Sequence, residues 1–253
     1  MKSLKLKICG LMRAQDMALC CALGVDILGF VTEYPLPVPW NLTREEARAR
    51  MAEVQPPAKI CLVTGGEVRK IVSLDLRPDY VQLHFRETLD ETMQVVRALS
   101  PHSIGVIKTI AGDADAQAAQ LGSVEPEVCA GMLEQAGVAA ILVGSHTPDN
   151  AGKPGCPADL ALYRQVREAT RIPVVLAGGV TPENVDSLLK NANPAWLDVM
   201  TGVEAAPGRK DAEKLNAMTA AVRTHSLEQG GTSADSIQVR RLPRSVSRDK
   251  SIL

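Results

Sequence analysis

The chain has 253 residues, of which 45% are hydrophobic and 23% charged, so it is long enough to bury one full-sized core. Its 28 basic and 29 acidic side chains leave a formal charge of −1, and only 3% of its residues are aromatic. This near-neutral charge provides no field that would attract nucleic acid or an anionic membrane surface, and stacking side chains for single strands are scarce. We therefore expect any anion to be bound by local groups.

The N-terminal stretch MKSLKLKICG alternates lysine with leucine and isoleucine, which predicts a strand rather than a signal peptide. No apolar run approaches the roughly 18 residues of a transmembrane helix, so we expect no membrane contact. The six cysteines include no CxxC pair, and neither they nor the four histidines have the spacing of a metal site. We predict a cytoplasmic protein without a metal.

Short apolar runs alternate with amphipathic stretches along the whole chain. The predicted strands cover 4–10, 26–31, 58–63, 80–85, 103–110, 139–144, 172–179 and 196–202, and the predicted helices 14–24, 44–54, 66–75, 89–100, 125–137, 157–169, 181–190 and 210–223. Eight βα units in about 220 residues predict a single-domain α/β fold, the (β/α)8 or TIM barrel, because a doubly wound sheet usually stops at five or six strands. We place the barrel in residues 1–224, and we expect residues 225–253 to be a disordered, basic tail rich in Ser and Arg.

Function in this fold lies at the C-terminal ends of the strands. The chemically informative residues at these predicted ends are Cys9, Gly10, Gln82, His84, Lys108, Gly178, Gly179, Asp198, Thr201 and Gly202. We expect a site assembled from them.

The loops after the last two strands predict a phosphate site. Gly178 and Gly179 allow a ligand to approach the backbone, and Thr181 is expected to cap a helix that starts at the next residue, a proline. Gly202 adds a glycine to the loop after strand eight, and these two loops are the usual phosphate site of the fold. The alternative is that the paired glycines only turn the chain.

Cys9 ends the first predicted strand, where a thiolate can serve as a nucleophile or a base if its pKa is lowered. Free cysteines are also among the most frequently buried residues, in which case the thiol is inert packing. The residues alone leave both interpretations open.

Several segments resemble the phosphoribosylanthranilate isomerase family. They are KICGLMRAQDM at 7–17, GVDILGFV at 24–31, VQLH at 81–84, VIK at 106–108, LAGGVTPENV at 176–185 and DVMTGVEAAPGRKD at 198–211, and the match extends from residue 5 to about 222. The resemblance implies an Amadori-type aldose–ketose isomerisation of N-(5-phosphoribosyl)anthranilate in tryptophan biosynthesis, on a (β/α)8 barrel with neither a metal nor an organic cofactor.

The resemblance also implies roles for individual residues. Cys9 would be the general base that removes the proton from C2 of the ribose, and His84 would stand at the wall of the site. Asp198 would brace the end of strand eight. The phosphate-binding residues would be Gly178, Gly179, Thr201 and Gly202.

The chain departs from the family pattern where the family binds anthranilate and donates a proton. Gly144 stands in place of the family's general-acid aspartate, and the segment 33–43 has no basic residue where the family carries an arginine for the anthranilate carboxylate. We regard Asp149, His146 and Glu33 as candidates to replace the acid. Arg86, which with Phe85 replaces a small–acidic pair, is a candidate cation for the substrate.

Two classes of function remain open. One is an isomerase of this family, or a divergent isomerase acting on another phosphorylated aminosugar. The other is a non-catalytic barrel that binds a sugar phosphate or serves as a partner subunit. The expected partner in both is a small phosphorylated sugar, and a homodimer is left open.

Overall fold

A ring of parallel strands forms the centre of the molecule, as the alternating pattern predicts. The computed structural model describes residues 4–73, 75–144 and 157–231. The ring consists of β1 (Lys5–Ile8), β2 (Ile27–Thr32), β4 (Lys59–Thr64), β5 (Tyr80–Leu83), β6 (Gly105–Ile110), β7 (Ala140–Val143), β8 (Val174–Ala177) and β9 (Trp196–Val199). Neighbours in sequence are neighbours in space, and β1 pairs with both β2 and β9, which closes the barrel. The single-domain TIM-barrel prediction is confirmed.

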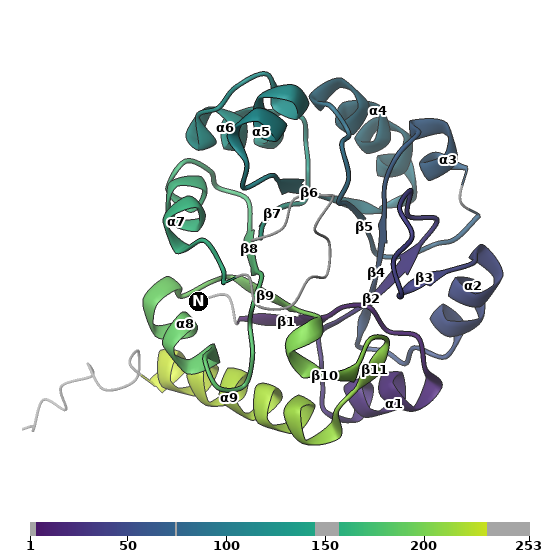
Figure 1. Cartoon of the computed structure of the whole chain (residues 1–253), viewed down its shortest axis with the longest axis vertical. Coiled ribbons are helices and arrows are strands. Elements are labelled where there is room, and N and C mark those ends of the chain that lie inside the picture. Colours follow the sequence, from purple (N-terminus) through teal and green to yellow (C-terminus); the bar gives the residue numbers. More distant parts are fainter. Residues whose placement is uncertain (1–3, 74, 145–156, 232–253) are drawn as a thin grey trace, which may run out of the picture.

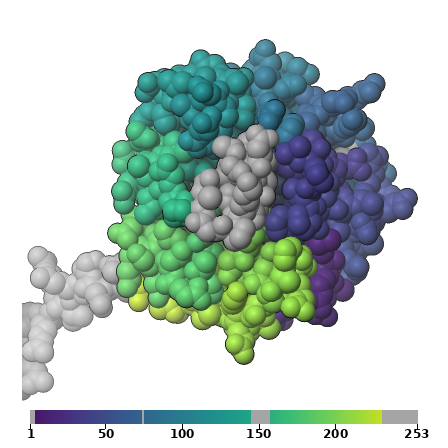
Figure 2. Space-filling view, viewed as in Figure 1, coloured from purple at the N-terminus to yellow at the C-terminus, as the bar shows by residue number. Residues whose placement is uncertain are grey.

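Helices surround the ring and cover its outer face (Figure 1). They are α1 (Ala14–Ala22), α2 (Arg44–Ala52), α3 (Val68–Val72), α4 (Leu89–Leu99), α5 (Ala114–Leu121), α6 (Pro126–Gln135), α7 (Leu160–Glu168), α8 (Val185–Ala192) and α9 (Ala212–Gly231). Figure 2 shows the same order on the surface, where segments of successive colour follow one another around the molecule. Within the part of the chain that is described, no helix has the length and apolar character needed to cross a bilayer.

The loops contain short strands and 3-10 turns. The strand β3 (Asn41–Leu42) pairs with the end of β2, and β10 (Glu204–Ala206) forms a hairpin with β11 (Arg209–Lys210). The 3-10 turns are η1 (Ser100–His102) and η3 (Thr201–Val203). Both β3 and η3 lie in loops that follow strands of the ring, at the end where this fold places its site.

Local sequence explains where several helices begin. Thr43 and Thr88 each form a capping box with the glutamate three residues later, in which the hydroxyl accepts from the glutamate N–H and the carboxylate accepts from the threonine N–H. The helix α5 was not predicted. Asp113 caps it by accepting a 2.9 Å hydrogen bond from the N–H of Ala116, but two of its three buried side chains are glutamines, so the stretch shows no apolar stripe.

Two predicted boundaries near the C-terminal end are wrong. The helix α8 begins at Val185, because the side chain of Asn184 accepts from the N–H of Thr181 and donates to the carbonyl of Gly179, which holds the intervening residues in a turn. The helix α9 continues beyond residue 224 to Gly231. In this extension His225 is buried, and its Nε2 lies 3.4 Å from Oδ1 of Asn193. Residues 232–253 of the predicted tail lie outside the described residues.

The prediction that Lys108 serves the site is also wrong. Ile107 belongs to the apolar cluster inside the barrel and Thr109 contacts His84, so the residue between them points to the opposite, outer face of β6. There the Lys108 ammonium lies 3.0 Å from the Glu87 carboxylate, with both side chains 0% exposed. Glu87 also accepts hydrogen bonds from the backbone N–H groups of Gly66 and Phe85, so it ties two loops to the strand.

We predict that Lys108→Met lowers the free energy of unfolding by about 3–5 kcal/mol, because it leaves the Glu87 carboxylate buried without its cation. Adding Glu87→Gln removes that charge and keeps an acceptor for one of the two N–H groups, so the double variant should regain part of the loss. Urea unfolding of the three proteins measures both effects. A double variant less stable than Lys108→Met alone would contradict the proposed role of the pair.

Candidate active site

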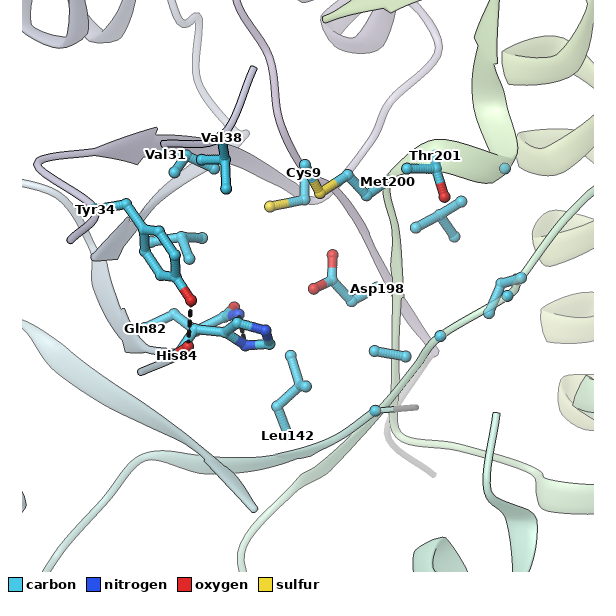
Figure 3. Close-up of a pocket in the computed structure, with 18 residues that line it drawn as sticks. Cys9, Val31, Tyr34, Val38, Gln82, His84, Leu142, Asp198, Met200 and Thr201 are labelled. Atoms are coloured by element: carbon cyan, nitrogen blue, oxygen red, sulfur yellow. Dashed lines mark hydrogen bonds between the residues drawn. The ribbon is translucent and has the colours of Figure 1, made fainter. Parts of the chain in front are cut away.

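A pocket opens at the C-terminal ends of the strands (Figure 3). Its centre is a buried ion pair between neighbouring strands. The register of β1 and β9 sets Lys7 beside Asp198, and the ammonium nitrogen lies 2.9 Å from Oδ2 of the carboxylate. The side chains are 1% and 9% exposed. Because residues two apart share a face of a strand, Lys7 and Cys9 point to the same side.

Two buried acceptors in the pocket lack protein partners. Oδ1 of Asp198 and Oε1 of Gln82 have no hydrogen-bond partner within the described structure, and both residues line the pocket. The Gln82 amide nitrogen is 3.5 Å from Nδ1 of His84, which lies 2.9 Å from the hydroxyl of Thr109. Buried polar atoms are normally hydrogen-bonded, so these oxygens suit a ligand with hydroxyl or N–H donors.

The Cys9 side chain occupies space that is open because residue 29 is a glycine. A Cβ at Gly29 would lie 3.0 Å from the Cys9 sulfur and 3.2 Å from Cε of Lys7, too close for either to keep its place.

Burial raises the pKa of the Cys9 thiol above its ordinary 9.0, and the Lys7 ammonium opposes this shift. Burial by itself would lower the pKa of Lys7, but the Asp198 carboxylate more than offsets this, so Lys7 remains charged. The thiol is therefore protonated at neutral pH, and a thiolate is stabilised by Lys7.

Another part of the pocket is formed by main-chain atoms of two glycine-containing loops. Gly178 and Gly179 have φ angles of 94° and 57°, which favour glycine, and Asn184 fixes the loop that follows them. Gly202 packs so tightly against this loop that a Cβ would overlap the carbonyl oxygen of Val180. The backbone N–H groups of all three glycines donate no hydrogen bond within the described part of the chain. Backbone N–H groups without a protein acceptor in the lining of a pocket suit a phosphate.

The remaining side of the pocket is apolar. We call it the apolar wall and define it as Val31, Tyr34, Val38 and Leu142, all of which line the pocket. Figure 3 shows Tyr34, Val31 and Val38 on the left and Thr201 on the right, with Cys9 and Asp198 between them. The pocket therefore joins an end lined by glycines, a polar centre with a thiol, and an apolar end.

One known protein family matches most of the chain. Residues 6–221 match the family described as N-(5'phosphoribosyl)anthranilate (PRA) isomerase. The chain belongs to this isomerase family. It is 30% identical over 226 residues to the N-(5'-phosphoribosyl)anthranilate isomerase of Methanosarcina acetivorans, covering 87% of this chain and 93% of that protein.

Solved structures of the isomerase family share the fold. The enzyme from Thermus thermophilus is 28% identical, with a TM-score of 0.69, over 87% of this chain and 99% of that one. Another isomerase, 25% identical with a TM-score of 0.66 over the same shares of the two chains, was solved with reduced 1-(o-carboxyphenylamino)-1-deoxyribulose 5-phosphate.

Most of the site residues that we predict from the sequence line this pocket. Those that line it are Cys9, Gln82, His84, Gly178, Gly179, Asp198, Thr201 and Gly202. Arg86 does not, since it is exposed and its guanidinium lies 5.6 Å from the centre of the Phe85 ring. Glu33 is also exposed and outside the lining, so the structure does not support it as a replacement acid. Asp149 and His146 lie outside the described residues.

Sequence reasoning missed three residues that shape the isomerase pocket. Lys7 was detectable, because a lysine two positions before Cys9 in an otherwise apolar strand shares its face. Gly29 and Tyr34 gave no comparable signal, since their roles depend on contacts with distant parts of the chain.

Among the described residues, no three His, Cys, Asp or Glu side chains are arranged to hold a metal ion.

We predict that Gly202→Ala weakens the binding of inorganic phosphate about tenfold or more, because the added methyl group pushes the two glycine loops apart and misplaces a charge-assisted hydrogen bond. Gly131→Ala is the matched control, since a Cβ there meets nothing within 4 Å. Calorimetry gives both affinities. Equal phosphate affinity in a folded Gly202→Ala protein would place the anion elsewhere.

Proposed function

We propose that the chain is a phosphoribosylanthranilate isomerase, which converts the aminoaldose phosphate into the corresponding aminoketose phosphate in tryptophan biosynthesis. The observation that carries this proposal is the meeting of Cys9, the ion pair and the glycine loops in one pocket of a chain that belongs to the family. A sugar phosphate needs an anion site at one end and a base near C2, and the pocket holds candidates for both.

The proposed chemistry uses few groups. The glycine loops hold the phosphate through backbone N–H groups, which leaves the pentose over the polar centre. Ring opening, with a proton added to the ring oxygen, gives an iminium at C1. The Cys9 thiolate takes the proton from C2, the C2–H electrons form the C1–C2 double bond of an enaminol, and the C1–N π electrons neutralise the nitrogen. Protonation at C1 with loss of the proton from the C2 hydroxyl then yields the ketose. Asp198, which is paired with Lys7 through Oδ2, accepts a hydrogen bond from the pentose or its nitrogen through Oδ1.

Turnover by the purified chain tests the proposal. Complementation of a tryptophan auxotroph that lacks the isomerase is the matching test in cells. Growth, together with measured isomerisation in vitro, is the expected result. A folded protein that binds sugar phosphates but turns over no substrate would favour the non-catalytic barrel instead.

We predict that kcat/KM rises about tenfold per pH unit through neutral pH and levels off only above pH 9, because the pKa of Cys9 is raised and only its thiolate is a base. Cys9→Ala should lower kcat/KM by at least about 100-fold with little change in phosphate affinity. Cys21→Ala, a half-buried cysteine on α1 outside the pocket lining, is the control. A plateau below pH 7, or wild-type rates in Cys9→Ala, would exclude Cys9 as the base.

Gly144 lines the pocket and has room for a side chain. A Cβ there would lie 3.4 Å from Cδ2 of Leu142 and 3.7 Å from Cβ of Ala177, which is ordinary contact. We predict that Gly144→Asp raises kcat about tenfold or more if the wild-type site lacks a general acid. Gly144→Asn adds the same bulk without an acid and should give no gain. If Asp raises the rate no more than Asn does, another group already donates this proton.

A further inference from the structure

A buried carboxylate on β10 joins two of the loops that form the pocket. Oε1 of Glu204 accepts a 2.8 Å hydrogen bond from the indole N–H of Trp40, which lies in the loop after β2. The same oxygen accepts from the Lys210 ammonium at 2.9 Å and from the backbone N–H of Gly208 at 3.2 Å. The side chains of Glu204 and Lys210 are 6% and 1% exposed, and Trp40 is also buried. We call Trp40, Glu204 and Lys210 the linking cluster.

Trp40 belongs to segment 33–43, which is closed on itself by hydrogen bonds. Asn41 accepts from the backbone N–H of Tyr34 and donates to its carbonyl, both at 3.0 Å. The strand β3, which begins directly after Trp40, pairs with β2. Tyr34 and Val38 of this segment line the pocket. The contact that Trp40 makes with Glu204 therefore sets where this side of the pocket lies.

Glu204 and Lys210 belong to the loop after β9, which carries part of the glycine-lined end. Met200 and Gly202 come shortly before Glu204 and line the pocket. The Lys210 ammonium also donates to the carbonyl of Met200 at 3.1 Å. The backbone N–H of Lys210 donates to Oδ2 of the buried Asp16 on α1, beside which Figure 1 shows the hairpin of β10 and β11. The hairpin is thus anchored to the barrel, and its carboxylate holds the indole.

The indole of Trp40 also packs against the backbone that follows Cys9. A Cβ at Gly10 would lie 3.0 Å from Cδ1 of Trp40 and 2.8 Å from Cε of Met200, so these two side chains enclose the glycine. Trp40 and Cys9 belong to one apolar cluster. Figure 3 shows Cys9 between Val38 on one side and Met200 on the other. The linking cluster therefore connects the two sides of the pocket next to the thiol that we propose as the base.

We propose that Trp40 and Glu204 are positioning residues of the isomerase. Their hydrogen bond fixes the spacing between the glycine loops and segment 33–43, so that one ligand reaches both while its pentose lies at Cys9. Neither residue lines the pocket, so both act through the loops that do. The inference rests on the proposed function, because it takes the glycine loops as the phosphate site.

The substitution Trp40→Phe keeps an aromatic ring beside Gly10 and removes the N–H donor. The spanning ligand for the test is reduced 1-(o-carboxyphenylamino)-1-deoxyribulose 5-phosphate, which has its phosphate and its ring at opposite ends. We expect Trp40→Phe to weaken the spanning ligand about tenfold and inorganic phosphate by less than about twofold. Calorimetry on the folded proteins measures both affinities. Trp196→Phe is the matched control, because Trp196 is the first residue of β9 and its ring contacts Tyr80 instead of the linking cluster.

The ratio of the two losses distinguishes positioning from general damage. A loss confined to the spanning ligand supports the inference, because a phosphate ion needs only one end of the pocket. Unchanged affinity of Trp40→Phe for the spanning ligand would overturn the inference, and so would an equal loss for inorganic phosphate. A loss in Trp196→Phe as large as that in Trp40→Phe would also overturn it.

Replacement of the ion pair tests whether Trp40 acts through Glu204. Glu204→Leu combined with Lys210→Met removes both charges together, which proteins often tolerate better than the loss of one partner. This double variant should weaken the spanning ligand about tenfold, and adding Trp40→Phe should cost no more than about a further twofold, because the hydrogen bond is already lost. Losses that multiply in full would contradict the link. If the double variant does not fold, the comparison of Trp40→Phe with Trp196→Phe decides alone.

Failure of the proposed function gives a different pattern of results. The affinities would then follow these expectations while the wild-type chain isomerises nothing. Failure of the inference alone would show as wild-type turnover together with unchanged binding of the spanning ligand in Trp40→Phe.

Discussion

The ion pair between Lys7 and Asp198 is the constraint on which the site depends. Removing a charge from water costs several kcal/mol, and this cost is offset only when an opposite charge lies nearby in good geometry. Lys7 and Asp198 meet this condition where β1 pairs with β9 and closes the barrel. The partners are 191 residues apart in sequence, so the pair exists only when β1 and β9 are in register. The closed barrel thus creates the charge arrangement, and the same pair supplies the cation beside the Cys9 thiol and a carboxylate that lines the pocket.

The pocket around this pair is built from three kinds of surface. Glycines line one end, where Gly202 allows two loops to approach each other closely. Apolar side chains with a fixed tyrosine form the other end. A ligand that spans both must place its middle over Cys9 and Asp198, so orientation follows from the two ends rather than from many polar contacts in the centre.

Much of this arrangement is predictable from local pattern, and the rest depends on contacts between distant residues. The alternation of strands and helices identified the barrel, and the glycines at 178, 179 and 202 identified the loops that converge. Lys108 was assigned to the site because a strand end does not reveal which face is interior; the buried Glu87 that it meets comes from another loop. The helix α5 was not predicted from the sequence because its buried face is rich in glutamine. Tyr34 becomes part of the site only through Asn41, His84 and Phe85.

The positive charge of Lys7 stabilises the thiolate form of Cys9 in the pocket. The most direct test is the pH dependence of iodoacetamide alkylation at Cys9, measured by mass spectrometry of the peptide that contains it, in wild type and in Lys7→Met. We expect a higher pKa for Cys9 in Lys7→Met, and therefore slower alkylation at every pH below the wild-type pKa, in a protein that still binds phosphate. An unchanged or lower pKa of Cys9 in that variant would contradict it.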